Sequence, residues 1–446
     1  MTEQLNDLGK EPIGKLLIKQ AVPATIGILV MSINMIVDTV FVGQWIGVLA
    51  IAAITVVLPI AFLISSLGMG IGIGGSSIIS RALGANQRGK AQLTFGNQIS
   101  LTLILAIIFV FVSHLFRIPI LDLFGAKGDI LPIASDYFSM IVYGVPFLAF
   151  AMMGNPVIRA EGKPKFAMMT LIIPAIMNLI LDVVFIKFMN LGMIGAGLAT
   201  SISFGSSGLF VLYFFLSRHS ELKIYYNNFK LKHEIVREIV ELGGVTVARQ
   251  GTISLLTIVL NYSLFTYGGE ISISIYGLIN RVMMFSLSPV LGVSQGFLPV
   301  VGYNIGAKEN KRVIETIKKS MLYGSLVGTV VFLGILMFKE EIIQIFTTDE
   351  TLLKNTPNAI FITFLATPII TLQLIGSAYF QAAGKAIPAL FLTLLKQGIF
   401  LVPLAYFLPK FFGVIGVWWS FPIADVLSTL ITILVLRKEI NKHLIE

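Results

Sequence analysis

Residues 66–85, SLGMGIGIGGSSIISRALGA, decide how this chain folds, because the chain contains a second version of them at residues 288–307, SPVLGVSQGFLPVVGYNIGA. Five positions are identical at an offset of 222, and they pair Ser66, Gly70, Gly74, Gly84 and Ala85 with Ser288, Gly292, Gly296, Gly306 and Ala307. The same register relates Gly162 to Gly384. A mostly apolar chain made of two similar halves is typical of secondary transporters, in which two repeats move around a site held between them.

The composition of the chain indicates that its solvent is lipid. Of 446 residues, 56% are hydrophobic and only 12% are charged, which is too little polar surface for a water-soluble protein of this length. Apolar runs long enough to cross a bilayer lie at roughly 16–43, 49–80, 94–115, 133–157, 166–188, 193–216, 238–266, 271–302, 318–338, 357–381, 389–408 and 414–436. We therefore predict an all-α polytopic membrane protein with twelve transmembrane helices in two pseudo-symmetric six-helix lobes.

The loops predict how the chain is organised and oriented. Six spans return the chain to its starting side, so we expect parallel repeats: an N-lobe at 1–216, a cytoplasmic connector at 217–236 and a C-lobe at 237–446. Loops on the side of the two termini hold 22 Lys and Arg residues, against 6 on the other side, which predicts that both termini are cytoplasmic. This topology also explains the net charge of +9, so no nucleic-acid partner is expected.

Carboxyl groups inside the apolar runs mark the candidate site, because an ionisable group at bilayer depth is costly without a partner or a cavity. Asp38 and Asp182 each follow an asparagine by four residues, Asn34 and Asn178, so amide and carboxyl share one helix face. Two carboxyl groups that converge in a dry pocket can share a proton. The alternative occupant is Na⁺, which Asp38, Asp182, the Asn178 carbonyl and the Thr200 hydroxyl could bind, and the sequence leaves both ions open.

The second half of the chain does not repeat these carboxyl groups, because Asp38 corresponds to Leu260 and Asp182 to Leu404. Its spans hold other ionisable residues, namely Arg249, Arg281, Lys396 and Asp425. Static pairing, for instance of Lys396 with Asp425, and direct contact with a substrate are both open for them.

Methionine and proline add two further expectations. Of the 16 Met residues, 12 precede residue 200, and flexible, polarizable side chains suit a pocket for varied lipophilic ligands. The residues expected at such a cavity are Met31, Met35, Met152, Met177 and Arg281. Pro23 removes a backbone hydrogen bond from the span that carries Asp38, so a change of charge there could couple to a helix bend.

Three segments carry a resemblance to a known family. Residues 74–84, their echo at 295–306 and Arg159-Ala-Glu-Gly162 resemble the multidrug and toxic compound extrusion (MATE) transporters, and the resemblance covers nearly the whole chain. The setting of Asp38 is similar to that in the DinF-like and MepA-like prokaryotic branch. The resemblance implies a cation site in the N-lobe at Asp38, Asn178, Asp182 and Thr200, with Tyr137 and Asn155 as polar neighbours and Pro23 as the helix bend.

The resemblance also implies a function. It predicts an antiporter that exports lipophilic, cationic compounds in exchange for H⁺ or Na⁺ by alternating access, as a monomer in the cell membrane of a prokaryote. No cofactor is expected, and no nucleophile and base pair suggests an enzyme. The main alternative is a flippase for lipid-linked saccharides, which would use a cationic cavity, and a passive channel is a further one.

Overall fold

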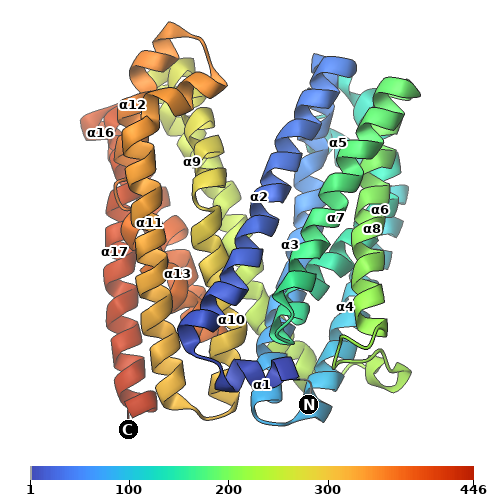
Figure 1. The fold of residues 1–446 in the computed structure, drawn as a ribbon. Helices are drawn as coiled ribbons and strands as arrows, with labels where there is room; N and C mark the ends of the chain where they lie inside the picture. Colours follow the sequence, from blue (N-terminus) through green and yellow to red (C-terminus); the bar gives the residue numbers. More distant parts are fainter. Residues whose placement is uncertain (1–2, 446) are drawn as a thin grey trace. The chain divides into compact units, whose positions relative to one another are not determined.

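The structure, a computed structural model, describes residues 3–445, and these residues form helices and no strand (Figure 1). The first half contains α1 (Glu3–Lys10), α2 (Ile13–Trp45), α3 (Val48–Gly84), α4 (Arg88–Leu115), α5 (Arg117–Leu123), α6 (Ile130–Ala160), α7 (Pro164–Asp182), the π-helical η1 (Val183–Phe188) and α8 (Gly192–Leu216). The second half contains η2 (Tyr226–Phe229), α9 (His233–Ser286), α10 (Ser288–Gly306), α11 (Asn310–Phe346), α12 (Glu350–Phe364), α13 (Thr367–Ala382), α14 (Ala386–Leu394), the π-helical η3 (Leu395–Leu401), α15 (Val402–Phe407), α16 (Pro409–Phe412), α17 (Val414–Ile440) and η4 (Asn441–Ile445).

These helices account for the twelve predicted spans. By length and composition, ten helices of the described chain can cross a membrane, and α12 with α13 makes an eleventh that is bent by 43°. One of the ten, α9, has 54 residues, more than twice the 20 or so that a bilayer needs. It is broken at Gly269, whose φ of 66° is outside the helical range, and the part after the break continues into α10. Dividing α9 at Gly269 gives twelve spans, and the predicted fold class is confirmed.

Two compact units make up the chain. Ile26–Gly243 belongs to the first unit, and Asp7–Thr25 belongs to the second with the residues from Gly244 onward. These two divisions fall inside helices, in α2 and in α9, and a third falls inside α1, after Asn6. The division in α2 comes two residues after Pro23, through which α2 continues as a helix. The expected role of Pro23 as a helix bend stays a prediction.

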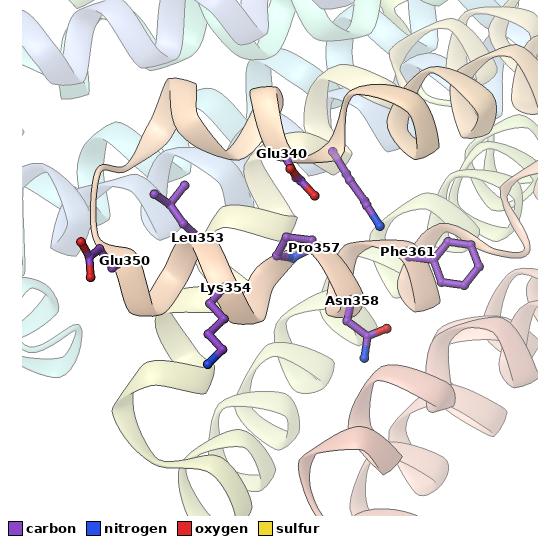
Figure 2. A pocket seen from close by; sticks show the side chains of 8 residues that line it. Glu340, Glu350, Leu353, Lys354, Pro357, Asn358 and Phe361 are labelled. Atoms are coloured by element: carbon purple, nitrogen blue, oxygen red, sulfur yellow. The ribbon is translucent and has the colours of Figure 1, made fainter.

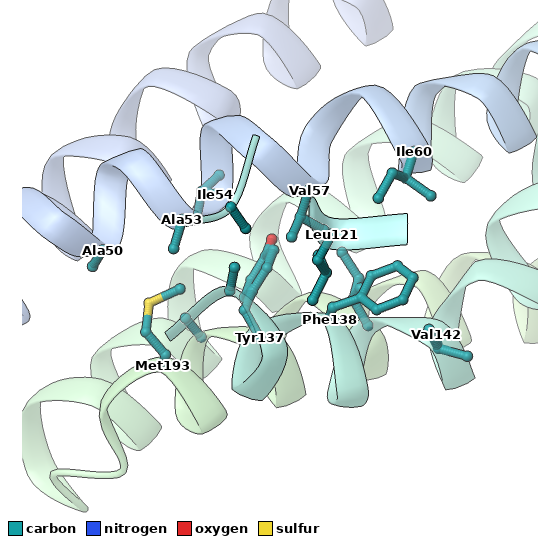
Figure 3. Packing of buried hydrophobic residues seen from close by; sticks show 14 of the residues in the cluster. Ala50, Ala53, Ile54, Val57, Ile60, Leu121, Tyr137, Phe138, Val142 and Met193 are labelled. Atoms are coloured by element: carbon teal, nitrogen blue, oxygen red, sulfur yellow. The ribbon is translucent and has the colours of Figure 1, made fainter. Parts of the chain in front are cut away.

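In the first unit, glycine residues allow the helices to pack closely against one another. A Cβ atom on Gly72 of α3 would lie 2.7 Å from the backbone oxygen of Met153 in α6, so only glycine permits this contact. Further along the same helices, α3, α6 and α8 share an apolar core with η1 and α5 (Figure 3). Tyr137 of α6 lies within this core and is only 3% exposed. The core therefore holds a polar side chain at membrane depth.

The second unit is built in the same way around α10. A Cβ atom on Gly296 would lie 2.9 Å from the backbone nitrogen of Ala21, so the first part of α2 packs directly on α10. The segment before α2 is held through its main chain, because the guanidinium of Arg312 donates to the carbonyl oxygens of Leu8 and Glu11 at 3.2 and 2.9 Å. Hydrogen bonds and small residues thus fix the start of α2 in this unit.

The connector between the halves is held by the first unit. The carboxyl of Glu161, at the end of α6, accepts three hydrogen bonds: from Ser220 Oγ at 2.8 Å, and from the backbone N–H groups of Glu221 and Leu222 at 3.1 Å each. Gln92 of α4 pairs with both backbone groups of Lys223, accepting from its N–H at 2.9 Å and donating to its carbonyl oxygen. These contacts order the first turn of the connector.

The rest of the connector is held in the same manner. Asn97 of α4 accepts from the backbone N–H of Lys232 at 2.8 Å and donates to the carbonyl oxygens of Asn228 and Lys230, each at 3.3 Å. Ser100, one turn further along α4, donates to the carbonyl oxygen of Phe229 at 2.8 Å. The connector is therefore fixed to α4 and α6 by side chains that recognise its main chain.

Glu161 makes this attachment sensitive to pH. The side chain is fully buried, and burial raises the pKa of its carboxyl from 4.5 to about 7, although the three accepted hydrogen bonds act in the opposite direction. Because the pKa is raised in the folded state, the stabilising contribution is fully present below pH 4.5 and is lost as the pH rises through about 7.

We expect hydrogen exchange at the Glu221 and Leu222 amides, corrected for the intrinsic chemical rate, to become faster as the pH rises from 4.5 to about 7. Glu161→Gln should remove this dependence, because an amide does not titrate. Glu341→Gln makes the same change at an exposed position of α11 and should behave like the unmodified protein. A pH dependence that survives in Glu161→Gln would assign it to another group.

Candidate functional site

The two asparagines of the predicted site hold α2 and α7 together. Asn34 Nδ2 donates to Asn178 Oδ1 at 2.9 Å and to the carbonyl oxygen of Ala175 at 3.3 Å. In chain order α2 is the first span of its lobe and α7 the fifth, so both helices run in the same direction through the membrane. Asp38 and Asp182 each lie four residues, about one helical turn, after their asparagine. The hydrogen bond between the asparagines therefore brings the two carboxyl groups together one turn further along the helices.

The two carboxyl groups face each other in a site that provides Asp182 with no other partner. The side chains of Asp38 and Asp182 are within hydrogen-bonding reach of one another, and the charge of Asp38 acts on Asp182. Asp182 is 0% exposed, whereas Asp38 is half-buried. Among the described residues, no donor other than the carboxyl of Asp38 reaches the oxygens of Asp182. A bound proton or a small cation is what could satisfy these oxygens.

A π-helical segment begins directly after Asp182. The α-helical hydrogen-bond pattern of α7 ends at this residue, and η1 continues from Val183 to Phe188. Segments of this kind are frequent at functional sites, because the wider turn re-aims the side chains around it. The change in helix type therefore coincides with the buried carboxyl.

Tyr137 and Thr200 form the third side of the site. Thr200 Oγ1 donates to the carbonyl oxygen of Ala196 at 3.0 Å, so its single hydrogen is used within α8. Tyr137 lies within hydrogen-bonding reach of Thr200. Gly197 permits this approach, since a Cβ atom there would lie 2.9 Å from the Tyr137 carbonyl oxygen. Tyr137 is also close enough to Asp38 and Asp182 to interact electrostatically with both.

Other residues named from the sequence lie outside this cluster. Asn155 belongs to a separate network, in which its Nδ2 donates to Thr170 Oγ1 and to the carbonyl oxygen of Ala167 at 2.7 Å each, while its oxygen accepts from Arg159 Nε at 3.1 Å. Among the expected cavity residues, Met31 is 47% exposed. The side chains of Met35, Met152 and Met177 are half-buried, and Arg281 is exposed in the second unit. Their assignment to a substrate cavity stays a prediction.

Sequence reasoning missed the hydrogen bond between the two asparagines. The signal was present, since Asn and Asp recur at the same spacing in both helices, but the pattern does not reveal that one asparagine contacts the other. It also missed the π-helical segments η1 and η3, for which the sequence offers no recognisable pattern.

A pocket of about 560 Å³ lies away from this site, between the end of α11 and α12 in the second unit (Figure 2). Its lining mixes charges of both signs, with Lys339 and Lys354 beside Glu340 and Glu350. The mixed lining selects no ligand charge, and we assign no function to it.

Comparison with known proteins agrees with the two-fold repeat. The MatE family profile matches this chain twice, over residues 23–184 and 247–407. The chain is 26% identical to the multidrug export protein MepA of Staphylococcus aureus (strain MRSA252), over 97% of this chain and 95% of the relative. It is 27% identical to MepA of Staphylococcus haemolyticus (strain JCSC1435), over 99% of this chain and 97% of the relative.

Solved structures share the fold. A multidrug resistance MATE family transporter of the MOP superfamily, in an outward-facing conformation, superimposes with a TM-score of 0.94 at 24% identity, covering 99% of this chain and 98% of the other. A MOP superfamily transporter from Pyrococcus furiosus Vc1 gives a TM-score of 0.91 at 24% identity, with the same coverage.

We expect Asp182→Asn to keep the fold and to raise the free energy of unfolding by about 1 kcal/mol in alkaline, Na⁺-free buffer, because the amide carries no charge and offers an N–H donor to Asp38. The midpoint of thermal unfolding in detergent measures this change. Asp182→Ala is the control, since it removes the charge but leaves a cavity and should not be stabilising. A large loss of stability in Asp182→Asn would indicate that the carboxylate has a static structural role.

Proposed function

Because this chain belongs to the MatE family of membrane transporters, we propose that it is a secondary antiporter that exports lipophilic cations in exchange for an inward-moving ion. The observation that carries the proposal is the buried carboxyl pair of the first unit, in which Asp182 has no partner among the described residues other than the carboxyl of Asp38. The relatives described above are multidrug export proteins, which supports a substrate class of varied drug-like compounds.

The pair supplies the chemistry of exchange. Two ionised carboxylates in contact would repel each other at bilayer depth, so the site holds a proton or a cation whenever it is closed to water. Loss of that ion leaves a negative charge, which favours a cationic substrate or a change of conformation. Strict exchange follows if ion and substrate compete for this charge, or if they favour opposite states of the transporter.

The supply of free oxygens favours H⁺ over Na⁺ as the coupling ion. Na⁺ needs several oxygen ligands, and one of the candidates, Asn178 Oδ1, already accepts a hydrogen bond from Asn34, which leaves it one lone pair. A proton needs only the two carboxyl groups. We therefore take the proton as the coupling ion and Asp38 and Asp182 as its carriers.

The substrate is expected to meet flexible, apolar side chains. In this proposal Met31, Met35, Met152 and Met177 contact it, because thioethers adapt to ligands of different shape. The protein acts as a monomer in the bilayer, without a cofactor.

Efflux of a fluorescent lipophilic cation from proteoliposomes tests the proposal. We expect an imposed pH gradient to drive export, and a Na⁺ gradient alone to drive little. Asp38→Asn and Asp182→Asn should each reduce export to the level of protein-free vesicles, because an amide cannot release a proton. Asp122→Asn, the same change at an exposed position of α5, should leave export intact.

Each other outcome has a meaning. Export driven by Na⁺ and lost in both site variants would keep the antiporter and replace its ion. Full export by either site variant would contradict the role of the carboxyl pair. Translocation of a lipid-linked saccharide with no gradient-driven export of cations would support the flippase instead.

A further inference from the structure

A second ionisable pair lies at membrane depth in the second unit. Lys396 Nζ is 2.6 Å from Asp425 Oδ1, which joins the π-helical η3 to α17. Both residues belong to segments apolar enough to span a bilayer. The proposed exchange at Asp38 and Asp182 makes no use of this pair.

The positive charge that balances Asp425 comes from the lysine. Asp425 is 3% exposed, and among the described residues its Oδ1 has no partner other than the Lys396 ammonium. One turn further along α17, the hydroxyl of Thr429 is also buried and has no hydrogen-bond partner among these residues. A buried ion pair that serves only stability is expected to have further hydrogen bonds, because a single partner does not offset the desolvation of two charges.

Other charged groups do not replace the lysine. On the elements packed around the pair, Lys385 and Glu439 bind each other at 2.5 Å. Tyr379 donates to the same Glu439 at 3.5 Å. Arg249 and Arg281 of α9 form no ion pair within the described part of the chain, and Lys396 is the charged group that acts on Asp425. The charge of the aspartate is therefore controlled by one titratable partner.

The side chain of the lysine is more exposed than that of the aspartate. The side chain of Lys396 is 16% exposed, against 4% for Asp425. The helix around Lys396 is π-helical, as is the segment that follows Asp182 in the corresponding span of the first repeat. Each lobe thus has an ionisable residue at a π-helical segment, paired with a carboxyl group on another helix. The pair is acid and acid in the first unit, but acid and base in the second.

Charge balance indicates what an acid and base pair can do. The ion pair is neutral, so a cation with a fixed charge can bind beside Asp425 at membrane depth only if another positive charge leaves. The ammonium of Lys396 can lose a proton and become a neutral amine, which keeps the total charge unchanged. We propose that the Lys396 and Asp425 pair is a second exchange site, where the cationic group of a substrate binds Asp425 and displaces the proton of Lys396.

In this step one N–H bond of the lysine ammonium breaks, its electron pair stays on nitrogen, and water on the exposed side of Lys396 accepts the proton. Release of the substrate reverses the step, and nothing is oxidised or reduced. The inference rests on the proposed export of lipophilic cations and adds a site in the second lobe. It makes the number of protons exchanged for each cation depend on both lobes.

Proton release on binding of tetraphenylphosphonium tests the inference, because the positive charge of this lipophilic cation is fixed and it carries no exchangeable proton. Purified full-length protein in weakly buffered detergent is mixed with the cation, and a pH indicator reports the protons released for each cation bound. The measurement is made on the unmodified protein, Asp38→Asn, Lys396→Arg and the double variant. Lys396→Arg keeps the positive charge beside Asp425, but a guanidinium does not give up its proton at accessible pH.

We expect Asp38→Asn and Lys396→Arg each to lose part of the proton release and the double variant to lose all of it. If Lys396→Arg releases as many protons as the unmodified protein while Asp38→Asn releases none, the second site is wrong and the proposed function stands. If Lys396→Arg releases none while Asp38→Asn is unchanged, the second site stands and the role of the first pair is wrong. Absence of binding or of proton release in the unmodified protein would overturn both.

A second variant guards against misfolding. Should Lys396→Arg fail to give a monodisperse protein, the neutral pair Lys396→Met with Asp425→Asn replaces it, because removal of both charges leaves no unpaired ion in the apolar interior. The expected result is the same loss of proton release. Proton release at the level of the unmodified protein would again overturn the second site.

Discussion

Hydrocarbon neither donates nor accepts hydrogen bonds, so each polar group at bilayer depth must find its partner within the protein. Most side chains of this chain meet the demand locally, as when Ser203 donates to the carbonyl oxygen of Ala199, one turn earlier. Asn34 and Asn178 meet it by binding each other across two helices. Asp182 does not meet it in this way: apart from the neighbouring carboxyl of Asp38, its oxygens have no hydrogen-bond partner among the described residues.

The two lobes satisfy this constraint with different chemistry, although their sequences descend from one pattern. Leucines in the second lobe occupy the positions that correspond to Asp38 and Asp182, so that lobe has no carboxyl pair there. Its own carboxyl lies on a different helix, beside a lysine. The two halves therefore have similar folds but differently charged pairs. The carboxyl pair of the first lobe includes no positive charge, whereas the carboxyl of the second lobe is paired with a lysine.

Much of the fold was predictable from the sequence, because its causes are periodic. The repeat and the apolar runs indicate twelve spans, and the spacing of Asn and Asp places the polar faces of α2 and α7. The break at Gly269 inside α9 was predictable too, because the apolar runs at 238–266 and 271–302 are separated at this point of the sequence. The π-helical segments and the pairing of Asn34 with Asn178 depend on contacts between helices, which a single sequence does not encode in a readable way. The role of the four residues as an ion site stays a prediction.

The attachment of the connector to the first unit has a consequence for how this protein can vary. Glu161, Gln92, Asn97 and Ser100 bind backbone groups, which all residues but proline offer alike. Substitution along the connector can therefore proceed with little penalty, provided that its length and path are kept, while the four anchoring positions are constrained. In an alignment of homologues, the connector would then vary in sequence, while the four anchoring side chains on α4 and α6 would stay constant. A conservation map would mark the anchoring positions and not the connector that they hold.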